Sequence, residues 1–257
     1  MVHDDRRRAE SFGDRAEMYD RVRPRYPVAL WDIILPRPGL RVLDVGCGTG
    51  IAAVAMGDRG AFVLGVDVDE RMAAQARTHG LEVEISPFED WSPAGRKFDR
   101  VTAAQSWHWV DPVRGMARAL ECLVAGGELC LFWNIGRPVG EVRAPLDSLY
   151  ARALGPQSYS GYASGFHHER TREQLRDTPG FEELEMSTLP WEARYSTEEW
   201  LALLPTHSDH ATLEPDERAR LLEAVGEIID RHGGELTVGY ATLLLRWRRL
   251  GEGVHGE

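Results

Sequence analysis

The sequence predicts an α/β protein built on a doubly wound, mostly parallel sheet. Short apolar runs alternate with helical segments from about residue 40 to residue 134, a rhythm typical of a parallel sheet covered by helices on both faces. A glycine-rich turn follows the first of these runs, in RVLDVGCGTG at residues 41–50. Since ligands of such sheets bind beyond the carboxyl ends of the strands, the turn predicts a ligand site.

Length and composition favour one soluble domain over residues 1–257. The chain is 43% hydrophobic and 28% charged, and it has no apolar run near the ~20 residues that a membrane helix needs. A polar N-terminus leads us to expect a cytoplasmic protein without a membrane partner. The net charge of −11 argues against a nucleic-acid partner. Three cysteines in apolar or glycine-rich surroundings indicate neither disulfides nor a metal cluster.

Residues 1–35 are expected to form an N-terminal helical cap. Residues 11–20 have helical character, Pro24 and Pro27 then interrupt the helix, and a second helix is expected over 28–35.

The core, residues 36–135, holds the alternating elements. In chain order we expect a strand ending in the glycine turn, a helix at 51–60, a strand at 62–68, a helix at 69–79, strands at 81–86 and 98–106, a helix at 112–124 and a strand at 126–134.

Residues 136–235 are expected to carry helices and insertions on the substrate side. A helix is predicted at 141–154, a lid-like segment rich in glycine, serine and aromatics at 157–169, strand character at 181–196, and helices at 197–204 and 215–234. A final strand at 236–249 closes the chain.

The glycine turn suits close approach of a ligand to the backbone. Gly46, Gly48 and Gly50 carry no Cβ, so the turn can adopt positive φ, and the following helix offers free N–H donors. Ile51 stands where a dinucleotide fingerprint needs glycine, which disfavours an NAD-dependent oxidoreductase. Asp44, at the strand end, is placed to accept hydrogen bonds from a cationic amino group, directly or through water.

Asp67 ends the next apolar strand, seventeen positions after Gly50. A carboxylate there can accept hydrogen bonds from both hydroxyls of a ribose, as in many dinucleotide enzymes. Aspartate at a strand end also serves turns and helix caps, so the assignment depends on its register with the glycine turn.

The stretch RVLDVGCGTG resembles the first motif of class I S-adenosylmethionine-dependent methyltransferases. The resemblance implies S-adenosyl-L-methionine as cofactor and a Rossmann-like sheet of seven strands with the last one antiparallel. It also implies cofactor contacts along the turn, from Cys47 and Thr49 as well as the three glycines.

Three further segments extend the resemblance. After the third strand, SPFEDW resembles the segment that borders adenine, with Phe88 and Glu89 as candidates and Asp90 as the alternative if the register slips. TAAQSWHWVDP resembles the fourth motif of a small-molecule subgroup and places Ala104 and Gln105 beside the amino-acid end of the cofactor. In AEMYDRVRPRYP, Tyr19 would cover the site and Arg23 would pair with the methionyl carboxylate, although both residue types also suit a plain surface loop.

Val68 and Met72 follow Asp67 and are candidates for contact with adenine. A methionine on a helix is equally well explained as a core residue. Phe88, Glu89 and Asp90, after the third strand, are equally well explained as a solvated acidic turn.

His108 is the candidate general base, because it lies past a strand end and the unperturbed pKa of a histidine side chain is near neutrality. A packing role at the rim of the pocket explains the presence of His108 equally well. Trp107 and Trp109 are candidate walls for an acceptor, or core residues. His207 and His210 have no acid or cysteine pattern that would indicate a metal.

The sequence thus predicts methyl transfer to O, N or C of a small-molecule metabolite. The resemblance is to type 11-like and trans-aconitate-type enzymes, and the fourth strand lacks the N-P-P-Y/F tetrapeptide of many nucleic-acid methylating relatives. A cofactor-binding protein of the same fold with another reaction remains the alternative. We expect no metal, and either a monomer or a homodimer.

Overall fold

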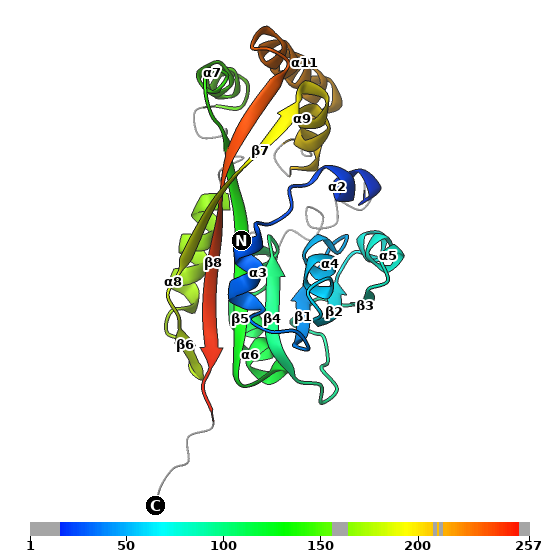
Figure 1. Cartoon of the computed structure of the whole chain (residues 1–257), viewed down its shortest axis with the longest axis vertical. Coiled ribbons are helices and arrows are strands. Elements are labelled where there is room, and N and C mark those ends of the chain that lie inside the picture. The colour runs from blue at the N-terminus through cyan, green and yellow to red at the C-terminus, as the bar shows by residue number, and fades with distance from the viewer. Residues whose placement is uncertain (1–15, 156–163, 208–209, 211–212, 252–257) are drawn as a thin grey trace, which may run out of the picture.

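The computed structural model describes residues 16–155, 164–207, 210 and 213–251. Its centre is a mixed sheet (Figure 1) whose strands lie in the order β3-β2-β1-β4-β5-β8-β6, with β7 also paired to β8. The strands span Arg41–Val45 (β1), Phe62–Asp67 (β2), Glu82–Ile85 (β3), Phe98–Ala104 (β4), Leu123–Pro138 (β5), Phe181–Glu183 (β6), Ser187–Ser196 (β7) and Glu235–Arg249 (β8).

Strands β1 to β5 pair in parallel, and β8 runs antiparallel to β5. The predicted α/β class, the mostly parallel sheet and the antiparallel last strand are therefore confirmed. The predicted strand at 181–196 is divided in two. β6 pairs with the end of β8 at 247–249, and β7 pairs with 235–244. β6 and β7 therefore share one position beside β8, so that eight strands occupy seven positions in the sheet.

Side-chain alternation in β1 explains why both faces of the sheet are covered. Val42 packs with Trp31 and Met56, whereas Leu43 and Val45 belong to a separate apolar cluster. The first face carries α3 (Val28–Ile34), α4 (Ile51–Gly57) and α5 (Glu70–Thr78), and the second carries α6 (Pro112–Cys122) and α8 (Ser164–Leu175).

Helix α8 differs from the predicted lid. The structure makes the end of the 157–169 segment helical from Ser164, and α8 packs beside α6 against β5 and β8. Leu175 anchors it, with 1% of its surface exposed. Tyr159 and Tyr162, two of the aromatics in the predicted lid, lie outside the described residues.

An upper lobe stands above the carboxyl edge of the sheet. β5, β7 and β8 continue past the ends of the other strands and carry α7 (Arg143–Leu154), α9 (Thr197–Leu203) and α11 (Pro215–Arg231) (Figure 1). An apolar cluster that includes Tyr150, Trp200 and Tyr240 joins these elements. A short helix, α2 (Ala16–Val22), lies between the lobe and the glycine turn, in contact with α9 and α5.

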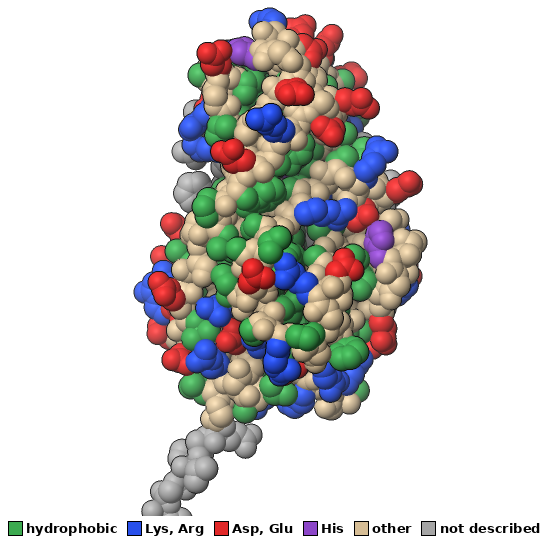
Figure 2. Space-filling view, in the orientation of Figure 1, with side chains coloured by type: hydrophobic (Ala, Val, Ile, Leu, Met, Phe, Trp, Pro, Cys, Tyr) green, Lys and Arg blue, Asp and Glu red, His purple; other side chains and the backbone are tan. Residues whose placement is uncertain are grey.

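Acidic and basic side chains are interspersed on the face of the molecule drawn in Figure 2, without a continuous basic stripe. Within the described ranges no helix is both long and apolar enough to span a bilayer.

Candidate functional site

The glycine turn joins β1 to α4 and its backbone requires glycine. Gly46 has φ of +62°, and a Cβ there would lie 2.6 Å from Cβ of Ser106. Gly48 has φ of +56°, and a Cβ there would meet nothing closer than the end of Met72 at 3.5 Å. Gly46 therefore lets the turn pack against the segment after β4, whereas the space above Gly48 stays open to a ligand.

Asp67, at the end of β2, fixes the turn from the neighbouring strand. Its Oδ2 accepts a hydrogen bond from the Gly48 N–H at 2.7 Å, and its Oδ1 accepts one from the Asp69 N–H at 2.9 Å. The residue is 8% exposed, and burial raises the pKa of its carboxyl although the two N–H donors oppose the shift. Its carboxylate is thus preorganised at the mouth of the turn.

Asp44 lies beneath the turn and is fully buried. Its Oδ1 accepts a hydrogen bond from Thr102 Oγ1 at 2.7 Å, while Oδ2 has no hydrogen-bond partner among the described residues. Burial raises the pKa of this carboxyl to about 7, and the nearby carboxylate of Asp67 adds to the shift. Asp44 therefore favours a cationic group as neighbour.

The Asp44→Asn variant should remove a pH-dependent part of the stability. An unfolded aspartate titrates near pH ~4, so between that pH and the folded pKa of about 7 the native state holds a proton that the unfolded state has lost. The free energy of unfolding of the wild type, relative to that of Asp44→Asn, should fall as the pH rises through this window. Urea unfolding of both proteins at pH 5 and pH 8 measures it, and an equal difference at both pH values would contradict it.

A cavity of about 980 Å³, counted with its open mouth, lies in front of the turn. Most of the residues predicted for cofactor binding in the core line it, namely Gly46, Gly48, Asp67, Val68, Met72, Phe88, Glu89, Ala104 and Gln105, together with Trp109. Phe88 and Met72 give it an apolar wall, since both are almost fully buried. The sequence analysis did not single out Ser86, Pro87, Ser106 and Val110, which also line it and lie within two residues of predicted ones.

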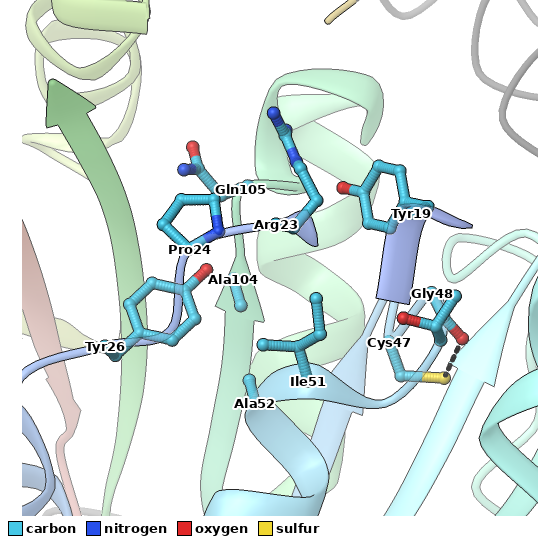
Figure 3. Close-up of a pocket in the computed structure, with 11 residues that line it drawn as sticks. Tyr19, Arg23, Pro24, Tyr26, Cys47, Gly48, Ile51, Ala52, Ala104 and Gln105 are labelled. Atoms are coloured by element: carbon cyan, nitrogen blue, oxygen red, sulfur yellow. Dashed lines mark hydrogen bonds between the residues drawn. The ribbon is translucent and has the colours of Figure 1, made fainter. Parts of the chain in front are cut away.

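A smaller cavity of about 400 Å³ adjoins the first and shares Gly48, Ala104 and Gln105 with it. Figure 3 shows the N-terminal segment on one side and the glycine turn with α4 on the other. The predicted Tyr19, Arg23, Cys47 and Thr49 line this cavity, and so do Pro24, Tyr26, Ile51 and Ala52, which the sequence analysis missed. Among these described lining residues, Arg23 alone carries a charge.

Tyr26 forms a rigid wall of the smaller cavity. Its ring makes edge contacts with Trp31 and Phe132, at centroid distances of 5.6 and 5.0 Å. Burial raises the pKa of its hydroxyl, so the hydroxyl remains a hydrogen-bond donor at neutral pH. The proline-bracketed RPRYP segment could have indicated a fixed aromatic, but its contacts with residues far along the chain are not readable from sequence.

Gln105 holds an unusual backbone conformation at the junction of the two cavities. Its φ is +62°, a region that residues other than glycine rarely adopt. Its N–H donates to the Phe132 carbonyl at 2.9 Å, and its side-chain Nε2 donates to the Asn134 carbonyl at 3.3 Å. The neighbouring strand β5 therefore fixes the turn after β4, as strained functional loops require.

Not every predicted site residue lies on these two cavities. Asp44, Gly50, Trp107 and His108 line neither of them. Trp107 is 1% exposed and packs on Phe88 in the core, so the geometry favours packing over acceptor contact for this residue. His108 lies beside Trp109, with ring centroids 4.9 Å apart, in a short 3-10 helix.

In the part of the chain that the structure describes, no three His, Cys, Asp or Glu side chains lie close enough together to hold a metal ion. Cys47, Cys122 and Cys130 are all buried as free thiols.

Part of the chain is similar to known methyltransferases. Residues 42–127 match the family model described as a methyltransferase domain. An uncharacterized methyltransferase of Mycobacterium tuberculosis is 40% identical over 131 residues, covering 48% of this chain and 52% of the relative. A ubiquinone biosynthesis O-methyltransferase of Hahella chejuensis is 39% identical over 108 residues, covering 39% and 45%. This chain spans about half the length of the curated relatives it matches.

Among solved structures, a protein of Anaeromyxobacter dehalogenans assigned as a type II methyltransferase aligns with a TM-score of 0.67 and 27% identity, covering 90% of this chain and 99% of the other. Residues 42–127 therefore match a methyltransferase domain, and the likeness to a solved structure extends over most of the chain. This match supports the family resemblance found in the sequence, while the trans-aconitate-type subgroup remains a prediction.

Proposed function

We propose that this protein transfers a methyl group from S-adenosylmethionine to O, N or C of a small molecule. The observation that carries the proposal is the pair of adjoining cavities at the glycine turn, one bordered by Asp67 and the other by Arg23. Their charges match a ligand with ribose hydroxyls at one end and an amino-acid group at the other.

The larger cavity suits the adenosine part. Asp67 would accept hydrogen bonds from the ribose hydroxyls, and the apolar side chains of Met72 and Phe88 would flank the adenine ring. Val68 is 40% exposed at the cavity wall and is a further candidate for this contact. Glu89 already accepts a hydrogen bond from the Asp111 N–H at 2.6 Å, so its side chain is held at the mouth.

The smaller cavity suits the amino-acid end. Arg23 would pair with the carboxylate, a task suited to a guanidinium. Its guanidinium lies 4.9 Å from the centre of the Tyr19 ring, which limits its freedom to swing away. Asp44, whose Oδ2 has no partner among the described residues, would favour the ammonium group nearby.

Methyl transfer from a sulfonium is a displacement that needs alignment and exclusion of water more than covalent help from the protein. S-adenosylmethionine, when bound, supplies the activated methyl group. The chain would hold both ends of the donor, so that the acceptor approaches past Gln105 and Trp109, where the larger cavity meets the segment after β4. Trp107, buried beside Phe88, would support the apolar wall of the same cavity.

His108 is proposed as the base that removes a proton from an acceptor that loses one. His108→Ala should then lower kcat about 100-fold and leave the Kd for S-adenosylhomocysteine within about twofold. Steady-state kinetics with such an acceptor, together with calorimetry, measures both constants. His108→Gln serves as the control for packing, and full activity in His108→Ala would leave His108 as a packing residue only.

A screen for labelled-methyl transfer tests the function itself. The purified protein is incubated with methyl-labelled S-adenosylmethionine and fractionated metabolites, and label should move into a small molecule. The quinone named in one relative's description makes phenols the first fractions to test. Tight binding of the donor without label transfer to any fraction would favour the repurposed cofactor-binding protein instead.

A further inference from the structure

Helix α2 carries Tyr19 of the smaller cavity and is followed directly by Arg23, yet it is weakly anchored by apolar contacts. It has seven residues, none of them buried. Val22 adds only a partly buried contact to the cluster of the upper lobe. Its hold on the glycine turn must therefore come largely from polar contacts.

Asp20 supplies those contacts with one carboxylate. Its Oδ1 accepts a hydrogen bond from Thr49 Oγ1 at 3.0 Å, and its Oδ2 lies 3.1 Å from Nε2 of His79. Thr49 belongs to the glycine turn and is 1% exposed, while His79 caps the C-terminus of α5. The side chain of Asp20 is itself only 13% exposed. A single residue thus ties α2 to both elements below it.

The residues that face the cavity lie on either side of Asp20 in the chain. Tyr19 precedes it directly, and Arg23 follows it by three positions. Arg25 strengthens the same connection, because its Nη2 donates to the Asp20 carbonyl at 3.0 Å. Wherever Asp20 is held, Tyr19 and Arg23 are held with it.

We propose that Asp20 is a positioning residue. Its carboxylate binds Thr49 and His79 and so holds α2 in place, which keeps Arg23 and Tyr19 over the amino-acid end of the cofactor. This inference rests on the proposed function, since it needs that end of the cofactor to occupy the smaller cavity. Asp20 lines neither that cavity nor the larger one, so its effect passes through its neighbours.

Two ligands distinguish a positioning role at the amino-acid end of the cofactor from a general effect on the binding site. S-adenosylhomocysteine has the amino-acid end, and 5′-methylthioadenosine lacks it but keeps the adenosine. Asp20→Ala should weaken S-adenosylhomocysteine about tenfold, the loss expected when one charged contact no longer forms. Binding of methylthioadenosine should stay within about twofold of the wild type, because Asp67 and the larger cavity are untouched. Titration calorimetry gives both constants.

Matched variants control for charge and for folding. Glu17→Ala removes the same charge from the same helix at an exposed position and should change neither constant. Thr49→Val removes the hydroxyl that Asp20 binds and should reproduce the selective loss. The double variant Asp20→Ala/Thr49→Val should show little further loss, since both changes break the same hydrogen bond. Because Thr49 itself lines the smaller cavity, His79→Ala, which removes the other partner of Asp20 and lines neither cavity, carries the test if Asp20→Ala does not fold.

Wild-type affinity for S-adenosylhomocysteine in both single variants would overturn the proposal. So would an equal loss for the two ligands, because it would show a general effect on the site. Failure of the wild type to bind either ligand would instead overturn the proposed function, on which the role of Asp20 depends.

Discussion

Asp67→Ala is expected to weaken S-adenosylhomocysteine about 100-fold or more, since each charged hydrogen bond contributes about 1.5–3 kcal/mol. Two effects combine in this loss. The variant has no acceptor for the ribose hydroxyls, and the N–H groups of Gly48 and Asp69 lose the carboxylate that now orients the turn. Unlike Asp20→Ala, it should weaken methylthioadenosine as strongly as S-adenosylhomocysteine, because both ligands carry the ribose.

Calorimetry with both ligands measures this, and Asp67→Asn is the matched control. Asparagine keeps the size and one acceptor oxygen, so its affinity should lie between those of the wild type and the alanine variant. Asp58→Ala, which removes a charge from an exposed position at the end of α4, should bind like the wild type. Unchanged affinity in Asp67→Ala would rule out the ribose role.

Gly46→Ala is expected to be strongly destabilising. Its φ of +62° is unfavourable for an L-residue, by about 1–2 kcal/mol. The added Cβ would also lie 2.6 Å from Cβ of Ser106, an atom fixed by the backbone, and relief of such overpacking adds about 1–3 kcal/mol. The free energy of unfolding should therefore fall by roughly 2–5 kcal/mol, with poorer cofactor binding because the turn must move.

Gly39→Ala isolates the backbone part of this effect. Gly39 has φ of +79°, but a Cβ there would meet no atom within 4 Å. Its variant should lose only about 1–2 kcal/mol. Urea unfolding of the three proteins measures both losses. Equal losses in the two variants would show that the contact with Ser106 contributes nothing.

Much of the fold was readable from local patterns. The apolar residues of the first strand, the glycines after it and Asp67 at the next strand end each lie within a few consecutive residues, and a parallel sheet wound on both faces follows from the alternation of strands with helices. The division between β6 and β7 was not readable, because the segment alternates throughout and only its pairing with the long strand β8 shows the interruption. Likewise β5 extends to Pro138, four residues past its predicted end, because β8 pairs with it from Glu128 to Pro138.

The site residues, too, were predictable where local sequence determines their place and not where long-range contacts do. Residues near the glycine turn and at strand ends were found, because their place follows from chain position. Asp20 and Tyr26 were missed, since Thr49 and His79 lie 29 and 59 residues from Asp20 in the chain, and Phe132 lies 106 residues from Tyr26. Trp107 was named with Trp109 as an acceptor wall, yet in the short 3-10 helix the two rings point to different places, one into the core and the other into the cavity.

The proposed function requires that the two adjoining cavities at the glycine turn hold S-adenosylmethionine. Titration calorimetry of the purified full chain with S-adenosylhomocysteine, and separately with NADH, tests this most directly. We expect saturable binding of S-adenosylhomocysteine at one site per chain and no heat from NADH. Binding of NADH, or no heat from either S-adenosylhomocysteine or S-adenosylmethionine, would contradict the proposed function.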